Sequence, residues 1–240
     1  MSAPLTVAVA QPACAAPGRP DTVAVNAERH AAAVRAAGGA RLVVFPELSL
    51  TGYDLAAPAL DPADGRLAPL VAACAETGAT ALAGAPVAGE DGREYIATLA
   101  VTGTGAGVVC RKTDLYGPEA ERFSPAEQPS VLELDGRRLG LAICADAADP
   151  AHAERLAALG VDAYVASTLY GAGADSVATK EARYPARAKD NSLWVVLATA
   201  AGASGSYPAT SGGSGVWAPD GSEVAKAGPG PDEIVTAVLR

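Results

Sequence analysis

The sequence predicts a layered α/β domain, on three observations. Short apolar runs with the composition of strands alternate with Ala- and Leu-rich stretches that have the composition of helices. The chain has 240 residues, half of them apolar, and is therefore long enough to bury a large core. No repeat, heptad pattern or low-complexity linker divides it. We therefore expect residues 1–240 to form a single domain.

The elements follow one another with clear start and stop signals. Stretches rich in helix formers, bounded by glycine or proline, predict helices at 26–37, 66–78, 150–159 and 175–190. Apolar, β-rich runs predict strands at 5–11, 40–48, 80–88, 94–103, 107–115, 161–168 and 193–202, with two or three more in the tail 214–240. The runs between 80 and 115 are joined by turn residues without a helix, which predicts a meander.

Two stretches carry special turn chemistry. Asp135-Gly136 lies between two apolar runs in 130–144, the strongest short-range signal for a hairpin, so Cys144 is expected to end a strand. The Gly- and Ser-rich stretch 200–215 fits either a mobile segment or an ordered loop that lines a site.

The composition argues against several classes of partner and site. A net charge of -9 disfavours nucleic-acid binding, which needs clustered Lys and Arg. The N-terminal segment has no basic lead-in, and no apolar run is long enough to cross a bilayer, so we expect a soluble, cytoplasmic protein. A metal site is poorly supported, and reduced thiols are expected, because the cysteines and histidines are few and scattered: Cys14, Cys74, Cys110, Cys144, His30 and His152.

Three expected strands end in residues whose chemistry fits together. Glu47 stands in "VVFPELSLTGY", Lys112 in "VVCRKTDLYGPEAERF" and Cys144 in "LGLAICAD". Strand ends and the loops after them are where α/β folds build their sites. Each residue also has an ordinary explanation: a solvated loop acid, an edge charge and a packed thiol.

A nucleophilic thiol needs a base, and the usual base is histidine. His30 falls within an expected surface helix, and His152 follows Cys144 too closely for an easy pairing. A carboxylate base with a lysine that stabilises negative charge is the alternative that this chain supplies.

Taken together, the three motifs resemble the nitrilase superfamily of carbon-nitrogen hydrolases. In that family a glutamate stands in "FPE" with "TGY" close behind, a lysine in "RK.HL", and a cysteine follows "G..IC" and precedes an acidic residue. This chain has "FPELSLTGY", "RKTDLYG" and "LGLAICAD" in that order. The flanks are also similar, from "VAVAQP" near the start to "SGGSGVWAPDG". The resemblance covers nearly the whole chain and implies a four-layer α-β-β-α sandwich of the nitrilase type.

The resemblance also implies roles for the site residues. Cys144 would be the nucleophile, Glu47 the general base and Lys112 the oxyanion stabiliser. A second glutamate in the family matches Glu119 best, with Glu121 as its competitor. The implied reaction is hydrolysis of a small amide or N-carbamoyl compound through a thioester. It needs no cofactor. Members of the family usually form dimers or larger assemblies, so the resemblance also implies a homodimer or larger homo-oligomer.

Some residues around these motifs depart from the family pattern or are candidates for the pocket. Ala145 stands where the family often has a bulky residue, and its N–H is a candidate oxyanion donor. "AADP" replaces the usual "FPE" after the Cys-x-Asp unit, and "KTD" stands where a histidine often follows the lysine. Tyrosines that flank the strand ends are candidate pocket residues: Tyr53, Tyr116 and Tyr170.

Two rival functions remain open. A serine amidase would use the 210–215 loop, with Ser211 or Ser214 as nucleophile and Lys112 as base. A non-catalytic binding protein would retain the fold alone. Replacing Cys144 by alanine separates the first rival from the thiol mechanism, because a serine enzyme keeps its activity.

Overall fold

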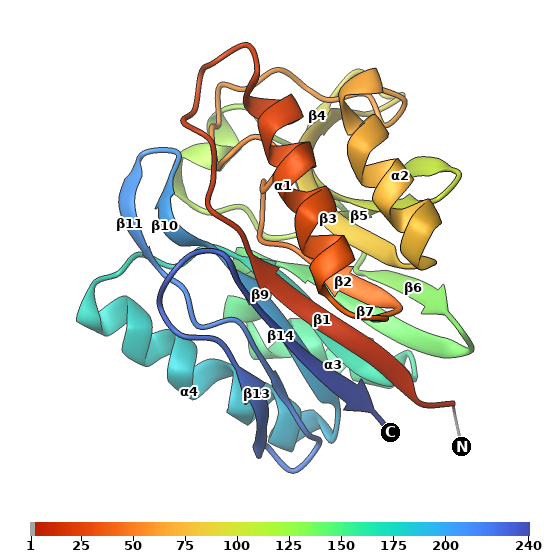
Figure 1. Ribbon diagram of the computed structural model, residues 1–240. Coiled ribbons are helices and arrows are strands. Elements are labelled where there is room, and N and C mark those ends of the chain that lie inside the picture. Colours follow the sequence, from red (N-terminus) through yellow and green to blue (C-terminus); the bar gives the residue numbers. More distant parts are fainter. Residues whose placement is uncertain (1–2) are drawn as a thin grey trace.

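The computed structural model describes residues 3–240, in which two six-stranded sheets lie face to face (Figure 1). The first sheet has parallel strands at its centre and antiparallel strands on both sides. Its strands, in spatial order, are β14 (Glu233–Leu239), β1 (Leu5–Gln11), β2 (Leu42–Val44), β3 (Thr80–Ala88), β4 (Glu94–Thr102) and β5 (Gly105–Arg111). Strands β3, β4 and β5 pair in succession, which confirms the predicted meander.

The second sheet repeats the plan of the first, with three parallel strands flanked by antiparallel ones. Its strands, in spatial order, are β13 (Glu223–Lys226), β12 (Gly215–Trp217), β9 (Trp194–Thr199), β8 (Ala163–Thr168), β7 (Arg137–Ile143) and β6 (Ser130–Leu134). Asp135 and Gly136 join β6 to β7 with positive φ at both residues, the geometry of a type I′ hairpin turn.

Four helices cover the outer faces of the sheets (Figure 1). The first sheet carries α1 (Thr22–Ala36) and α2 (Ala68–Thr77), and the second carries α3 (Pro150–Ala158) and α4 (Ala174–Asn191). Apolar side chains form one core between the sheets and one between each sheet and its helices. The predicted four-layer α-β-β-α sandwich is therefore confirmed.

Some element bounds differ from those expected. Helix α1 begins at Thr22, before the expected 26, and β2 ends at Val44, where the expected strand ran to 48. The stretch 200–215 is an ordered hairpin for most of its length, made of β10 (Ala201–Ser204) and β11 (Tyr207–Ser211). These differences lie in segments where Gly, Pro or Thr leave the sequence signal ambiguous.

His30 lies in the expected surface helix, but on the face of α1 that packs against the sheet. It is only 1% exposed, its ring centroid lies 4.0 Å from that of Phe45, and its Nδ1 lies 2.6 Å from the carbonyl oxygen of Asn26. Burial lowers the pKa of His30 to about 4, so the ring is neutral at pH 7. The face of α1 that packs on the sheet is wider than the apolar pattern of its sequence suggests.

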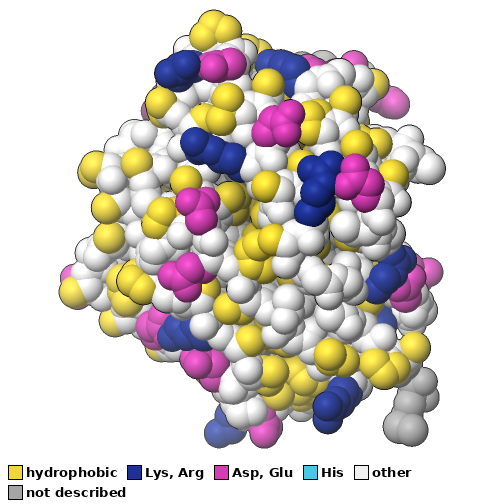
Figure 2. Space-filling view, viewed as in Figure 1, with side chains coloured by type: hydrophobic (Ala, Val, Ile, Leu, Met, Phe, Trp, Pro, Cys, Tyr) yellow, Lys and Arg dark blue, Asp and Glu magenta, His cyan; other side chains and the backbone are white. Residues whose placement is uncertain are grey.

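The surface gives two further observations. On the face seen in Figure 2, acidic and basic side chains are interspersed, without a field of one sign. Within residues 3–240, no helix has the length and apolar character needed to cross a membrane.

Candidate active site

The segments that follow β2 and β5, together with a 3₁₀ helix, bring an amine and two carboxylates into one buried cluster. Lys112 directly follows β5, and its Nζ donates to Glu47 Oε1 at 2.6 Å. The same Nζ lies 2.7 Å from both carboxylate oxygens of Glu119. The exposed fractions are 2% for Glu47 and 0% for both Lys112 and Glu119, so water does not screen these charges. Residues 65 positions apart are thus joined in a single ion cluster.

The second carboxylate of the cluster belongs to Glu119, whereas Glu121 is exposed. Glu119 lies in the short 3₁₀ helix Gly117–Glu121. The N–H of Tyr116 donates to its Oε2 at 2.8 Å. The hydroxyl of Tyr53 donates to its Oε1 at 2.7 Å. Glu119 therefore links Lys112 to two other segments of the chain and has no freedom to swing away.

The loop that carries Glu47 is seated on a glycine of β3. A Cβ placed on Gly84 would come within 2.2 Å of the backbone nitrogen of Leu48 and 3.0 Å of the carbonyl carbon of Glu47. Gly84 also donates its N–H to Ser49 Oγ and accepts from the N–H of Leu50. Only glycine allows the two backbones to approach this closely. The position of the Glu47 carboxylate is therefore set by backbone contact with the neighbouring strand.

Cys144 lies at the sharp turn where β7 ends and the 3₁₀ helix Cys144–Ala148 begins. Its φ is +48°, in the left-handed region that non-glycine residues rarely adopt. Asp146, which is 0% exposed, holds this turn: its Oδ2 accepts from the N–H of Ile143 at 2.8 Å. Its Oδ1 accepts from the backbone N–H groups of Thr113 and Asp114. One carboxylate therefore ties the Cys144 turn to the segment that follows Lys112.

The sequence signalled Asp146 only as the acidic residue after the cysteine and assigned it no role. Its signal was the short spacing in "CAD", because a carboxylate two residues after a strand end is placed to accept backbone N–H groups of that turn.

Burial and charge set the protonation of the cluster. Burial, opposed by the charge of Lys112, raises the pKa of Glu47 to about 7. Burial and the neighbouring charge of Glu47 raise the pKa of the Cys144 thiol well above its usual value. For Lys112, burial is outweighed by Glu47, Cys144 and Glu119, so its pKa is raised and it is a cation at pH 7.

With these protonation states, one carboxylate oxygen of Glu47 is free to accept a proton, and the Cys144 thiol carries one. Glu47 Oε2 is buried and has no hydrogen-bond partner within residues 3–240. The Cys144 thiol donates weakly to the carbonyl oxygen of Leu169, at 3.7 Å. A thiol that is not ionised at rest needs a base when it attacks, and the free oxygen of Glu47 can act as that base.

A cavity of about 440 Å³ opens over Cys144. All four pocket residues expected from the sequence line it: Tyr53, Tyr116, Ala145 and Tyr170. Tyr116 is 59% exposed and lies at the rim, whereas Tyr53 and Tyr170 are buried in the wall. The wall also contains residues that the sequence did not single out, and these are Ala148, Leu169, Gly171, Ser176, Arg183 and Tyr207. Their signals were weak because none of them belongs to the Glu, Lys or Cys motif: Ser176 and Arg183 lie on α4, and Tyr207 begins β11.

The residues of the rival mechanisms lie elsewhere. The Oγ of Ser214 is 0% exposed and bonds to the backbone of Thr199, and the Oγ of Ser211 accepts from Lys180 Nζ at 3.2 Å. His152 is also 0% exposed, and its Nδ1 lies 3.1 Å from the hydroxyl of Tyr164. Lys112 bonds to carboxylates and to neither serine.

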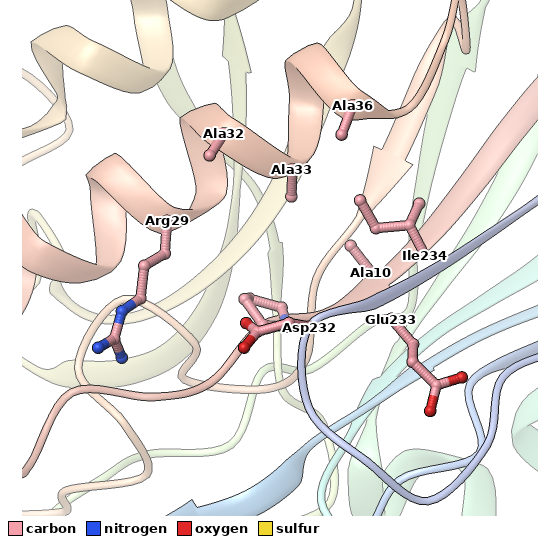
Figure 3. A pocket seen from close by; sticks show the side chains of 9 residues that line it. Ala10, Arg29, Ala32, Ala33, Ala36, Asp232, Glu233 and Ile234 are labelled. Carbon is pink, nitrogen blue, oxygen red and sulfur yellow. The ribbon is translucent and has the colours of Figure 1, made fainter.

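A second hollow, of about 240 Å³, lies between α1 and the start of β14. Figure 3 shows Ala33 and Ala36 of α1 across this hollow from Ala10 and Ile234. The charged side chains at its edge are already engaged, since Asp232 accepts from the N–H of Ala13. The hollow has an apolar lining without a nucleophile, and the cavity over Cys144 is the candidate active site.

Metal-ligating side chains do not gather elsewhere in the described residues. Within residues 3–240, no group of three or more His, Cys, Asp or Glu side chains has the arrangement of a metal site. All four cysteines are free thiols, as expected.

Comparisons with known proteins agree with this fold. A model of the carbon-nitrogen hydrolase family matches residues 6–240. The protein named hydrolase in pqqF 5′ region, from Pseudomonas protegens, is 36% identical over 220 residues, which are 88% of this chain and 76% of that protein. An (R)-stereoselective amidase from a Pseudomonas species is 30% identical over 220 residues, 88% of this chain and 78% of that protein.

A solved structure extends the likeness to three dimensions. The amidase from Nesterenkonia sp. AN1, a nitrilase-superfamily member solved as a cysteine mutant with butyramide, superposes with a TM-score of 0.79. It is 27% identical, and the match covers 98% of this chain and 90% of that one. The family match spans nearly all of the described fold and includes Glu47, Lys112, Glu119 and Cys144. This chain therefore belongs to the carbon-nitrogen hydrolase family.

Proposed function

We propose that this protein hydrolyses a non-peptide carbon-nitrogen bond of a small amide or N-carbamoyl compound and releases ammonia or an amine. The observation that carries the proposal is the contact of Lys112 with two buried carboxylates beneath a cavity that Cys144 lines. The amidase relatives support amide hydrolysis as the type of reaction. We also propose that residues 1–240 act as one catalytic domain, and that Cys144, Glu47, Lys112 and Glu119 are its catalytic machinery.

In the first step, Cys144 Sγ attacks the amide carbonyl carbon while the free Oε2 of Glu47 takes the thiol proton. Negative charge develops on the carbonyl oxygen. The N–H of Ala145, beside the thiol on the cavity wall, and the Lys112 cation are the groups that stabilise it. Glu119 and Tyr53 hold Lys112 from behind, so that its charge stays near the reacting carbon.

In the second step, protonated Glu47 gives its proton to the leaving nitrogen, and the carbon-nitrogen bond breaks. The acyl group remains on Cys144 as a thioester. Glu47 then takes a proton from water, which attacks the thioester and restores the thiol. A pKa near 7 lets Glu47 act in turn as base and acid at neutral pH.

A screen for ammonia release tests the proposal. The probes are butyramide, acrylamide, an N-carbamoyl amino acid and butyronitrile, each with wild-type protein and with Cys144→Ala. We expect release from at least one amide or carbamoyl compound, and loss of that release in the variant. Activity retained by Cys144→Ala would favour the serine mechanism. No release from any probe would favour a non-catalytic binding protein.

A trapped intermediate tests the mechanism apart from the substrate. Glu47→Gln loses the base of both steps, so the probe is p-nitrophenyl butyrate, an ester whose leaving group needs no proton. Intact-mass measurement after mixing should show an acyl group on the protein, because the group that activates water is absent. The double variant Glu47→Gln, Cys144→Ala is the control and should carry no adduct. An adduct on the control would place the nucleophile elsewhere.

The wider setting is also a proposal. We propose a cytoplasmic location because the free thiols suit a reducing compartment. The resemblance implies a homodimer or larger homo-oligomer. Light scattering at micromolar concentration measures the oligomer, and a monomer would contradict this part of the proposal.

A further inference from the structure

Arg183 is a cation on the wall of the active-site cavity. It lies in α4, is half-buried, and lines the cavity together with Cys144 and Tyr170. Its Nη1 donates to the hydroxyl of Tyr170 at 2.7 Å, and its guanidinium carbon lies 5.8 Å from the centre of that ring. Tyr170 in turn shares a hydrogen bond of 3.0 Å with the hydroxyl of Tyr184, which is fully buried. The guanidinium is thus anchored through one of its five N–H groups.

No carboxylate neutralises this arginine within residues 3–240. Most other arginines of the chain pair with an Asp or Glu, as Arg122 does with Glu94 at 2.7 Å and Arg35 with Glu76 at 2.6 Å. Arg183 has no such ion pair in the described residues. A half-buried guanidinium loses part of its hydration, and a protein that keeps it unpaired in a cavity leaves its remaining donors for a ligand. Arg183 thus places a positive charge without a carboxylate partner in a protein whose net charge is -9.

We propose that Arg183 selects amides whose acyl chain carries a free carboxylate, such as the monoamides of short dicarboxylic acids. The inference rests on the proposed function, because the amide group is the one that Cys144 attacks. A planar guanidinium matches a carboxylate with two parallel N–H donors. An acyl carboxylate stays in the cavity through both steps of the reaction, whereas a group on the leaving amine departs after the first. A cavity of about 440 Å³ suits a short chain between the two ends of such a substrate.

Pairs of isosteric amides test the inference. Succinamate and glutaramate are compared with 4-methylpentanamide and 5-methylhexanamide, in which an isopropyl group replaces the carboxylate. Wild-type protein should show a kcat/KM for each anion that is roughly tenfold to a hundredfold above that for its neutral partner, the range for a hydrogen bond to a charged group. Most of the difference should lie in KM.

Variants of Arg183 test whether this side chain causes the preference for the anionic amide over its neutral partner. Arg183→Gln should lower the ratio of the two kcat/KM values roughly tenfold or more, and Arg183→Lys should retain part of it. Arg155→Gln is the matched control: it removes the same charge from α3, where Arg155 is half exposed and lies outside the cavity, and should leave the ratio as in wild type. A purely structural role for Arg183 would lower both kcat/KM values together and leave their ratio unchanged.

The outcomes separate the inference from the proposed function. Equal hydrolysis of the anionic and neutral partners by wild-type protein, or a ratio that Arg183→Gln does not change, would overturn the inference while amide hydrolysis stands. Failure to hydrolyse these amides and every amide and N-carbamoyl probe of the ammonia-release screen would overturn both.

Discussion

Two buried lysines, Lys112 and Lys180, show how the partner of an ammonium group decides what it can do. Lys112 is 0% exposed and lies between two carboxylates that raise its pKa. Lys180 is 3% exposed and donates to Ser211 Oγ and to the carbonyl oxygen of Gly212. Its carboxylate partner, Glu181, is partly exposed and lies 3.4 Å away, so burial prevails and lowers the pKa of Lys180. Both ammonium groups are buried beside a hydroxyl- or thiol-bearing loop. Burial alone therefore does not mark a lysine as catalytic.

The surroundings separate the two lysines further. The Lys112 cluster lies beside a strained cysteine that faces a cavity of about 440 Å³. Ser211, the hydroxyl nearest to Lys180, is buried and donates to the backbone of Gly212. A site needs an unpaired acceptor and room for substrate, and the free Oε2 of Glu47 supplies the first. Lys180, in contrast, ties the turn after β11 to α4.

Replacing each lysine by methionine should separate their roles most strongly. Lys112→Met removes the charge near the reacting carbon, so kcat/KM should fall roughly a hundredfold to a thousandfold. Lys180→Met should retain kcat/KM within about threefold but lose roughly 1 to 3 kcal/mol of stability, because Ser211 Oγ and the carbonyl of Gly212 each lose a buried donor. Amide hydrolysis and urea unfolding of both variants make the measurement. A large loss of activity in Lys180→Met alone would point to a serine mechanism in which Lys180, and not Lys112, is the base.

Gly84→Ala should act on the Lys112 cluster without touching its charges. The new Cβ would meet the backbone nitrogen of Leu48 at 2.2 Å, so the Glu47 loop must move. A shift of about 1 Å at the base predicts a fall in kcat of roughly tenfold to a hundredfold. Gly107→Ala in β5 is the matched control, since nothing lies within 4 Å of its Cβ. Equal kcat values for the two variants would mean that the loop does not position Glu47.

The sequence predicted the part of the site that lies at strand ends. Glu47, Lys112 and Cys144 each stand in a recognisable local motif after an apolar run. Glu47 and Cys144 follow strands that have a parallel neighbour, and Lys112 follows the antiparallel strand β5. The hairpin at Asp135-Gly136 and the meander followed from turn residues of the same local kind. Local signals thus predicted which elements form and where each ends.

Features that depend on the facing side of a helix, or on contacts between distant segments, were not predicted. The burial of His30 within its surface helix was not predicted, because the many alanines of that helix fit a buried and an exposed face equally well. Arg183 drew no attention because its helix is rich in charges, and only its place over the cavity distinguishes it. The choice between Glu119 and Glu121 depended on which side of a single 3₁₀ turn faces Lys112.

The fall of kcat/KM at low pH tests how the charges around Lys112 set the pKa of Glu47. Glu47 must be ionised to take the thiol proton, and its pKa is raised to about 7, so kcat/KM should fall as the pH drops through 7. The charge of Glu119 contributes to that rise. Glu119→Gln should therefore move the acid limb of its residual activity to lower pH. A limb that stays in place would mean that another group titrates.

The same raised pKa has a consequence for stability, with the opposite sign. A carboxyl whose folded pKa lies above its unfolded value is bound to a proton more strongly in the folded state, so its contribution to stability is lost as the pH rises from about 4.5 to 7. Glu47→Gln should abolish this dependence. Urea midpoints of wild type and variant at pH 5 and pH 7.5 measure the difference.

Ser214→Ala should have the smallest effect on activity. It tests whether the serine-containing loop beside Lys180 has a structural role only. The Ser214 Oγ accepts from the N–H of Thr199 at 3.0 Å and donates to its carbonyl oxygen at 3.3 Å. Alanine leaves that buried N–H without a partner, which should cost roughly 1 to 3 kcal/mol in urea unfolding. Activity should stay within about twofold of wild type, because Ser214 contacts neither Lys112 nor the cavity over Cys144. A hundredfold loss of activity with unchanged stability would contradict this structural role. It would identify Ser214 as the nucleophile, since only a hydroxyl that attacks substrate combines those two results.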